Sequence, residues 1–68
     1  MAKEVVVQGG GENLYKVSES GGTFYVYKVN VGLIGNSTNN IGQTRSFDDA
    51  LAIIKAHSGK EIKRIGEW

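Results

Sequence analysis

Three consecutive glycines, Gly9 to Gly11, follow an apolar triplet and form the stretch of this chain most like a functional motif. A glycine-rich turn that opens into a helix can bind phosphate, because its backbone N–H groups and the positive end of the helix dipole face the anion. The Walker pattern continues with Gly-Lys-Ser/Thr, whereas Glu12 follows the glycines here, and Leu14 stands where the dinucleotide pattern requires its third glycine. We therefore interpret the glycines as a corner between two strands.

Few side chains in the sequence are suited to nucleophilic, acid–base or metal chemistry. The chain has no cysteine and one histidine, His57, which a predicted helix separates from Ser46 by roughly 16 Å at 1.5 Å per residue. Asp48 and Asp49 are adjacent, and neighbouring helical positions do not face each other. We expect no catalytic residue, no metal site and no cofactor, and we expect solvent or nearby carbonyl groups to satisfy His57.

The composition limits the class of protein further. Sixty-eight residues suffice for one domain, residues 1–68, and a chain this short buries only about 60% of its unfolded surface. A formal net charge of +1 is not the basic excess expected of a protein held to nucleic acid mainly through phosphates. The charged start does not resemble a signal peptide, and no apolar run approaches the roughly 20 residues of a membrane span. We expect a cytoplasmic protein with no membrane partner.

Glycine clusters separate segments rich in Val, Tyr and Phe, a pattern typical of successive antiparallel strands. The predicted strands cover Val5 to Gln8, Asn13 to Ser18 and Thr23 to Val31. A polar loop is expected from Gly35 to Asn40, because asparagine and glycine suit turns, and a short fourth strand is expected from Ile41 to Thr44.

One amphipathic helix is predicted from about residue 47 to residue 58. Ser46 and Asp49 match a capping box, apolar residues recur three and four positions apart, and Gly59 is suited to ending a helix. Beyond it, Glu61 to Ile65 is expected to be a fifth strand or, alternatively, a tail. The predicted fold is α+β with two layers, an antiparallel sheet of four to five strands packed on a single amphipathic helix in the order β-β-β-β-α-β.

A two-residue turn at Gly21-Gly22 predicts the register of the central hairpin. It places Lys16 opposite Tyr27, whereas a three-residue loop would place Lys16 against Lys28, a like-charge pair. Because side chains alternate across a strand, this register divides the residues between two faces. The face expected to pack on the helix, at Phe47, Leu51 and Ile54, carries Tyr15, Val17, Phe24 and Val26. The second face carries Leu14, Lys16, Ser18, Tyr25, Tyr27 and Val29.

One helix can cover only one face of this sheet, so the second face is expected to stay open. Tyr25, Tyr27 and Val29 would then form an exposed apolar patch, and such patches usually mark an interface. The alternative is that both faces are internal, because the sheet curls or because the C-terminal segment with Trp68 folds across it.

The strand Thr23 to Val29, TFYVYKV, resembles over seven residues the aromatic strand motifs of RNA-recognition and cold-shock domains, whose exposed rings stack on bases. The spacing of glycines and aromatics in those motifs is not reproduced, and the RNA-recognition fold has two helices where one is predicted here. We assign the chain to no family.

The first functional hypothesis is a small non-catalytic binding or adaptor module. Its open sheet face, around Lys16, Tyr25 and Tyr27, would contact another protein or a second copy in a homodimer. The alternative is a single-stranded nucleic-acid-binding domain in which the two tyrosines stack on bases. In that case the phosphate contacts would come from Lys16, Arg45, Lys63 and Arg64. An enzyme is a distant third possibility.

Overall fold

The computed structural model describes residues 1–9, 13–32 and 35–68, and it has the predicted α+β architecture in the predicted order. Its elements are β1 (Ala2–Val7), β2 (Leu14–Ser20), β3 (Thr23–Val31), β4 (Asn36–Thr44), α1 (Phe47–Ser58) and β5 (Ile62–Glu67). Gly9 is described and has a φ of 95°, whereas the rest of the predicted glycine corner lies outside the described residues. The described part of the chain contains no helix long and apolar enough to cross a membrane.

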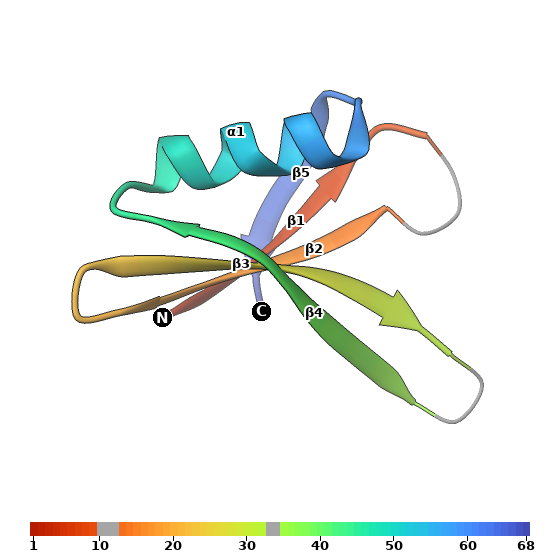
Figure 1. Ribbon diagram of the computed structural model, residues 1–68. Coiled ribbons are helices and arrows are strands. Elements are labelled where there is room, and N and C mark those ends of the chain that lie inside the picture. The colour runs from red at the N-terminus through yellow and green to blue at the C-terminus, as the bar shows by residue number, and fades with distance from the viewer. Residues whose placement is uncertain (10–12, 33–34) are drawn as a thin grey trace.

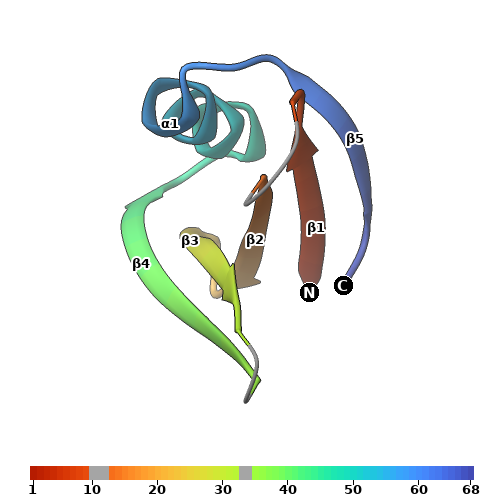
Figure 2. The ribbon, with the colours of Figure 1, turned by 90° about the vertical axis from the view of Figure 1, so that its right-hand side faces the viewer.

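The five strands form one antiparallel sheet in the order β4-β3-β2-β1-β5. The first four strands follow one another along the chain as a meander, and α1 carries the chain back to the opposite edge, where β5 pairs with β1 (Figure 1). The segment after the helix is therefore a paired strand and not a tail. Figure 2 shows α1 over one side of the sheet, with β4 and β5 at its two margins.

The central hairpin has the predicted two-residue turn. Gly21 and Gly22 have φ values of 58° and 84°, so both occupy the left-handed region that glycine reaches without steric cost. The side chain of Glu19 accepts a hydrogen bond of 2.8 Å from the N–H group of Gly22 and reinforces the turn. Lys16 lies opposite Tyr27 as predicted, so the turn determines which side chains share a face.

The expected loop from Gly35 to Asn40 is wrong in most of its length. Residues 36–40 belong to β4, where Asn40 lies opposite Tyr27 and Ser37 opposite Asn30. Local preference favours turns for Asn and Ser, but strand preference depends strongly on the available partner, and eight residues of β3 pair with β4. Tertiary pairing therefore overrides the local signal.

Helix α1 begins and ends at the predicted residues. The Oγ atom of Ser46 accepts a hydrogen bond of 3.1 Å from the N–H group of Asp49, and Gly59, with a φ of 71°, donates its N–H group to the carbonyl of Lys55. The acidic side chains of the first turn and the basic side chains of the last turn both suit the helix dipole. Capping and charge thus define the twelve-residue helix from sequence alone.

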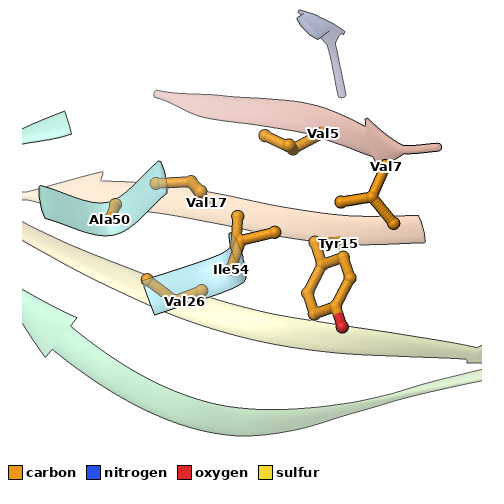
Figure 3. Packing of buried hydrophobic residues seen from close by; sticks show 7 residues of the cluster. All are labelled: Val5, Val7, Tyr15, Val17, Val26, Ala50 and Ile54. Carbon is orange, nitrogen blue, oxygen red and sulfur yellow. The ribbon is translucent and has the colours of Figure 1, made fainter. Parts of the chain in front are cut away.

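The core lies between α1 and the helix-facing side of the sheet. Ala50 and Ile54 of the helix are fully buried, and Figure 3 shows them beside side chains of β1, β2 and β3. The buried cluster consists of Val5, Val7, Tyr15, Val17, Val26, Ala50 and Ile54, with Phe24, Ile41, Phe47, Leu51, Ile53 and Ile62 partly buried around it. This composition confirms the prediction that the face with Tyr15, Val17, Phe24 and Val26 packs on the helix.

Candidate binding face

The sheet face turned away from α1 is here called the distal face. Its residues are the strand neighbours of the buried core residues, because side chains alternate between the two faces of a sheet. Because Val5, Tyr15 and Val26 point toward the helix, their strand neighbours point the other way. The distal face carries Glu4 and Val6 of β1, Leu14, Lys16 and Ser18 of β2, Tyr25, Tyr27 and Val29 of β3, and Arg64 of β5, with Trp68 following β5.

The structure brings the predicted binding residues Lys16, Tyr25 and Tyr27 together on this face. Lys16 pairs with Tyr27, and Ser18, the next distal residue of β2, pairs with Tyr25. All three predicted residues are half-buried. They therefore form part of a packed surface and do not stand free in solvent as an exposed patch.

Trp68 provides the exposed aromatic ring of the distal face. Its backbone N–H group donates a hydrogen bond of 3.3 Å to the carbonyl of Ala2, and the Nζ atom of Lys16 lies 4.7 Å from the centroid of its ring. At this distance the ammonium group makes a favourable cation–π contact. The ring is still 51% exposed, so the C-terminal residue covers part of the face around Lys16 and keeps an aromatic surface in contact with solvent.

A groove of about 570 Å³ lies on the same face, on the side of Lys16 away from Trp68. Its apolar lining residues are Val6, Leu14, Val29 and Val31, and its polar lining residues are Glu4, Asn13, Lys63 and Arg64. Val6 pairs with both Leu14 and Arg64, so the groove crosses β5, β1 and β2 toward β3. The side-chain amide of Asn13 donates to the carbonyls of Val7 and Gly9 and fixes one end.

The expected exposure of Val29 is wrong, because this residue is fully buried although it lies on the distal face. The outer residue of the same strand, Val31, is 60% exposed instead. The alternation that assigns Val29 to the distal face is correct, but alternation takes no account of neighbours packing over a twisted sheet. The exposed apolar surface is therefore at Val31 and Trp68, and the tyrosines and Val29 lie between them.

Charges are distributed unevenly between the two sides of the sheet. Arg64 contacts Glu4 on the distal face, with 3.1 Å between Nη1 and Oε2, and Lys63 lines the groove beside them. Together with Lys16, three cations thus share this face with one carboxylate among the described residues. The other acidic side chains of the described residues lie at the central hairpin turn, in the first helical turn, before β5 or in an ion pair with Lys3; they are Glu19, Asp48, Asp49, Glu61 and Glu67. The distal face is therefore positive although the whole chain is nearly neutral.

Arg45, the remaining predicted phosphate contact, is not part of this cluster. It is exposed and follows Thr44 at the end of β4, whereas the groove lies level with Val29 and Val31 near the other end of the same hairpin. Thr38 is the strand partner of Val29, and Arg45 lies seven positions further along extended chain. The Cα atoms of Thr38 and Arg45 are therefore roughly 20 Å apart. The structure thus gathers Lys16, Lys63 and Arg64 and leaves Arg45 apart.

A polar contact on the opposite face was not predicted. The hydroxyl group of Tyr15 lies 2.8 Å from Nδ1 of His57, and the two rings meet edge to face with centroids 5.6 Å apart. Burial raises the pKa of Tyr15 above its ordinary value. The sequence alone predicts solvent or carbonyl groups around His57, and only the position of α1 over β2 identifies Tyr15 as its partner. The contact joins the helix to the sheet.

The side chains that the distal face presents are apolar, cationic and aromatic. Among the described residues no group of three or more His, Cys, Asp or Glu side chains comes together to hold a metal ion. The distal face offers an apolar groove, three cations and an exposed indole, which suit recognition of an extended partner. No protein-family model, curated protein or solved structure matches the chain.

Proposed function

We propose that the chain is a non-catalytic binding module whose distal face holds an extended segment of another protein. The observation that carries this proposal is the groove lined by Val6, Leu14, Val29 and Val31, with Lys63 and Arg64 beside it. The apolar residues of the groove can bind an apolar side chain of the partner. The cations beside them can pair with carboxylates that flank this side chain. The partner of this chemistry is an extended peptide with one large apolar residue flanked by acidic residues.

The exposed indole of Trp68 extends the same surface. Tryptophan and tyrosine are enriched among residues that dominate binding energy. Lys16 links the two kinds of ring, because its Nζ atom lies 4.7 Å from the Trp68 ring and its strand partner is the half-buried Tyr27. A peptide that leaves the groove along β2 would meet Lys16 and then the indole. A second copy of the chain is the other protein that this face could hold, as in a homodimer.

Selection from a random peptide display library tests the proposal. We expect recovered peptides to share an apolar residue flanked by acidic ones and to bind the Lys63→Glu variant at least about tenfold more weakly, because reversing a charge beside the groove opposes the peptide carboxylates. Arg45→Glu is the matched control, because Arg45 is an exposed cation that follows β4 and lies apart from the groove. Peptides that bind both variants equally, or that share no acidic residue, would count against this function.

Single-stranded nucleic acid is the second candidate, and the separation of charges favours it. Such proteins combine a positive groove with aromatic side chains on which bases stack. Lys16, Lys63 and Arg64 supply the positive charge on the distal face, and Trp68 supplies an exposed ring beside the two tyrosines. The overall charge of +1 remains its weak point.

Salt dependence distinguishes the two candidates. Trp68 is the single tryptophan of the chain, so its fluorescence reports directly on the distal face. If a short oligothymidylate binds, its affinity should fall steeply with added salt, because each phosphate contact releases counterions. For three phosphate contacts, a tenfold rise in salt concentration should lower the binding constant about 100-fold or more. An unchanged Trp68 signal in low salt would rule out this candidate. A salt-insensitive association would exclude phosphate contacts as its cause.

A further inference from the structure

We propose that the outer edge of β4 pairs with the same edge of a second copy of the chain, in an antiparallel two-fold contact centred on Thr38. β4 is the outermost strand on its side of the sheet and is nine residues long. An outermost strand presents a row of backbone N–H and C=O groups to the side away from its neighbour, and another strand can pair with that row. Ser37 to Asn40 are all exposed.

The two edges of the sheet differ in how they are protected against such pairing. β5, at the opposite edge, carries Lys63, Arg64 and Glu67, and the latter two are in ion pairs with β1. Charged side chains on an edge strand oppose the approach of a second strand. The sequence of β4, NSTNNIGQT, contains neither a charged residue nor a proline. The β4 edge is therefore the one available for pairing.

A bulge confines the regular part of this edge to residues 36–40. Val26 pairs with Gly42 and Tyr27 with Asn40, so Ile41 is an extra residue on β4. A bulge bends the strand and increases its twist, which makes pairing across it difficult. The helix also reaches β4 beyond the bulge, where an added Cβ atom on Gly42 would lie 3.3 Å from Cδ1 of Ile53. The contact surface is the short segment before the bulge.

When this segment is paired antiparallel with its own copy, a polar residue faces a polar residue at every position. In the register centred on Thr38, this residue faces its own copy, and Ser37 faces Asn39. Directly opposed Thr–Thr pairs and pairs of polar side chains stabilise antiparallel strands. A two-fold contact uses the same patch on both copies, and a net charge of +1 gives little repulsion between them. The chemistry of the edge thus favours a second copy as its occupant.

The contact is small, and its strength should depend on concentration. Five residues of strand pairing bury far less than the roughly 1,200 Å² of a stable interface, so the dimer should form reversibly at high protein concentration. This association goes beyond the function proposed above, because it uses the backbone of β4 and not the groove or Trp68. The joined sheets would place two distal faces on one side of a ten-stranded sheet, which doubles the surface available to a long partner.

Sedimentation equilibrium with charge variants of Thr38 tests the proposal. The mass should rise from 7.3 kDa toward twice that value as the concentration of the natural chain increases. Thr38→Lys and Thr38→Glu should each weaken dimerisation at least about tenfold, because like charges then oppose each other across the two-fold axis. A 1:1 mixture of the two variants should recover dimers, since Lys and Glu then face each other.

Gln43→Lys is the matched control, because Gln43 is an exposed residue of the same strand beyond the bulge, and its dimerisation should equal that of the natural chain. Circular dichroism of each variant checks that the monomer is folded. A mass of 7.3 kDa at every concentration would overturn the proposal. So would a dimer that tolerates both Thr38 variants, which would place the interface elsewhere, or a mixture that stays monomeric while both variants are folded.

Discussion

The hydroxyl group of Tyr15 and the Nδ1 atom of His57 lie 2.8 Å apart and join the central strand β2 to the last turn of α1. The two residues are separated by 42 positions in the sequence, and the Tyr15 ring is buried in the core. The contact is the side-chain hydrogen bond that links the two layers among the described residues. It fixes the end of the helix over the sheet, and its energetic value can be measured.

Tyr15→Phe should lower the free energy of unfolding by about 1 kcal/mol, because it removes this hydrogen bond and leaves the ring packing intact. The exposed His57 can bond to water instead, so the loss should not be larger. Urea denaturation monitored by circular dichroism measures it. Tyr25→Phe, the same change on the distal face, is the control and should cost less than half as much. Equal losses in the two variants would mean that the bond contributes nothing.

Stability should also depend on pH through Tyr15. Burial raises its pKa above the ordinary value of 10.0, so above about pH 10 the unfolded chain loses the phenol proton while the folded chain keeps it. The stabilising contribution of Tyr15 is therefore complete below pH 10 and is lost as the pH rises through the folded-state pKa. Urea midpoints should fall more steeply between about pH 9 and about pH 11 in the natural chain than in Tyr15→Phe. If the urea midpoints of the two chains fall equally with pH, the pH dependence does not come from Tyr15.

Ser46→Ala should destabilise the domain by about 1 kcal/mol, because the N–H group of Asp49 loses its acceptor at the helix N-terminus. Ser46→Asn retains a side-chain oxygen at this position and should restore most of the loss. Thermal unfolding followed at the helical circular dichroism band compares the three chains. A stable Ala variant would show that the cap is not needed once the helix is packed.

Gly42 and Gly66 should respond in opposite ways to alanine. A Cβ atom on Gly42 would meet Ile53 at 3.3 Å, tighter than ordinary contact, whereas the nearest atom to a Cβ on Gly66 is a Glu4 oxygen at 3.8 Å. Gly42→Ala should therefore cost about 1 kcal/mol by displacing the helix. Gly66→Ala should be neutral or slightly stabilising, because alanine lowers the conformational entropy of the unfolded chain, so less entropy is lost on folding. If Gly42→Ala is as stable as the natural chain, Ile53 can move aside without a loss of folding free energy.

Trp68 should be quenched more strongly by iodide than its exposure alone explains, because the Lys16 ammonium group lies 4.7 Å from its ring and attracts anions. Lys16→Met should reduce iodide quenching by roughly two- to fivefold in low salt and leave quenching by neutral acrylamide almost unchanged. A parallel change for both quenchers would show that the substitution altered the exposure of the ring and not the local charge.

Most of the fold could be predicted from signals that involve only a few neighbouring residues. The cap at Ser46, the terminator Gly59 and the two positive-φ glycines of the central hairpin each act over a few residues, and all were placed correctly. The hairpin register followed from keeping Lys16 away from Lys28, and with it the division of side chains between the two faces. Where the physical cause is local, the prediction was correct.

Nonlocal effects account for what the sequence did not reveal. Taken alone, the residue types at 36–40 predict a loop, whereas their pairing with β3 makes them part of a strand. Val29 lines the groove together with Val6 of β1 and with Lys63 and Arg64 of β5, and Trp68 reaches Lys16 from the end of β5, so both features involve strands distant in the sequence. The groove itself requires Lys63 and Arg64 to lie next to Val6, which only the pairing of β5 with β1 brings about.

An amide-resolved NMR titration tests the central claim, that the distal face is the binding surface, most directly. A peptide with one apolar residue flanked by acidic residues, and separately a short single-stranded oligonucleotide, would be added at low and at moderate salt. We expect the amide peaks of Lys16, Tyr27 and Arg64 and the indole peak of Trp68 to shift, and the peaks of α1 to stay unchanged. Shifts confined to α1, or no shifts with either ligand, would contradict this claim.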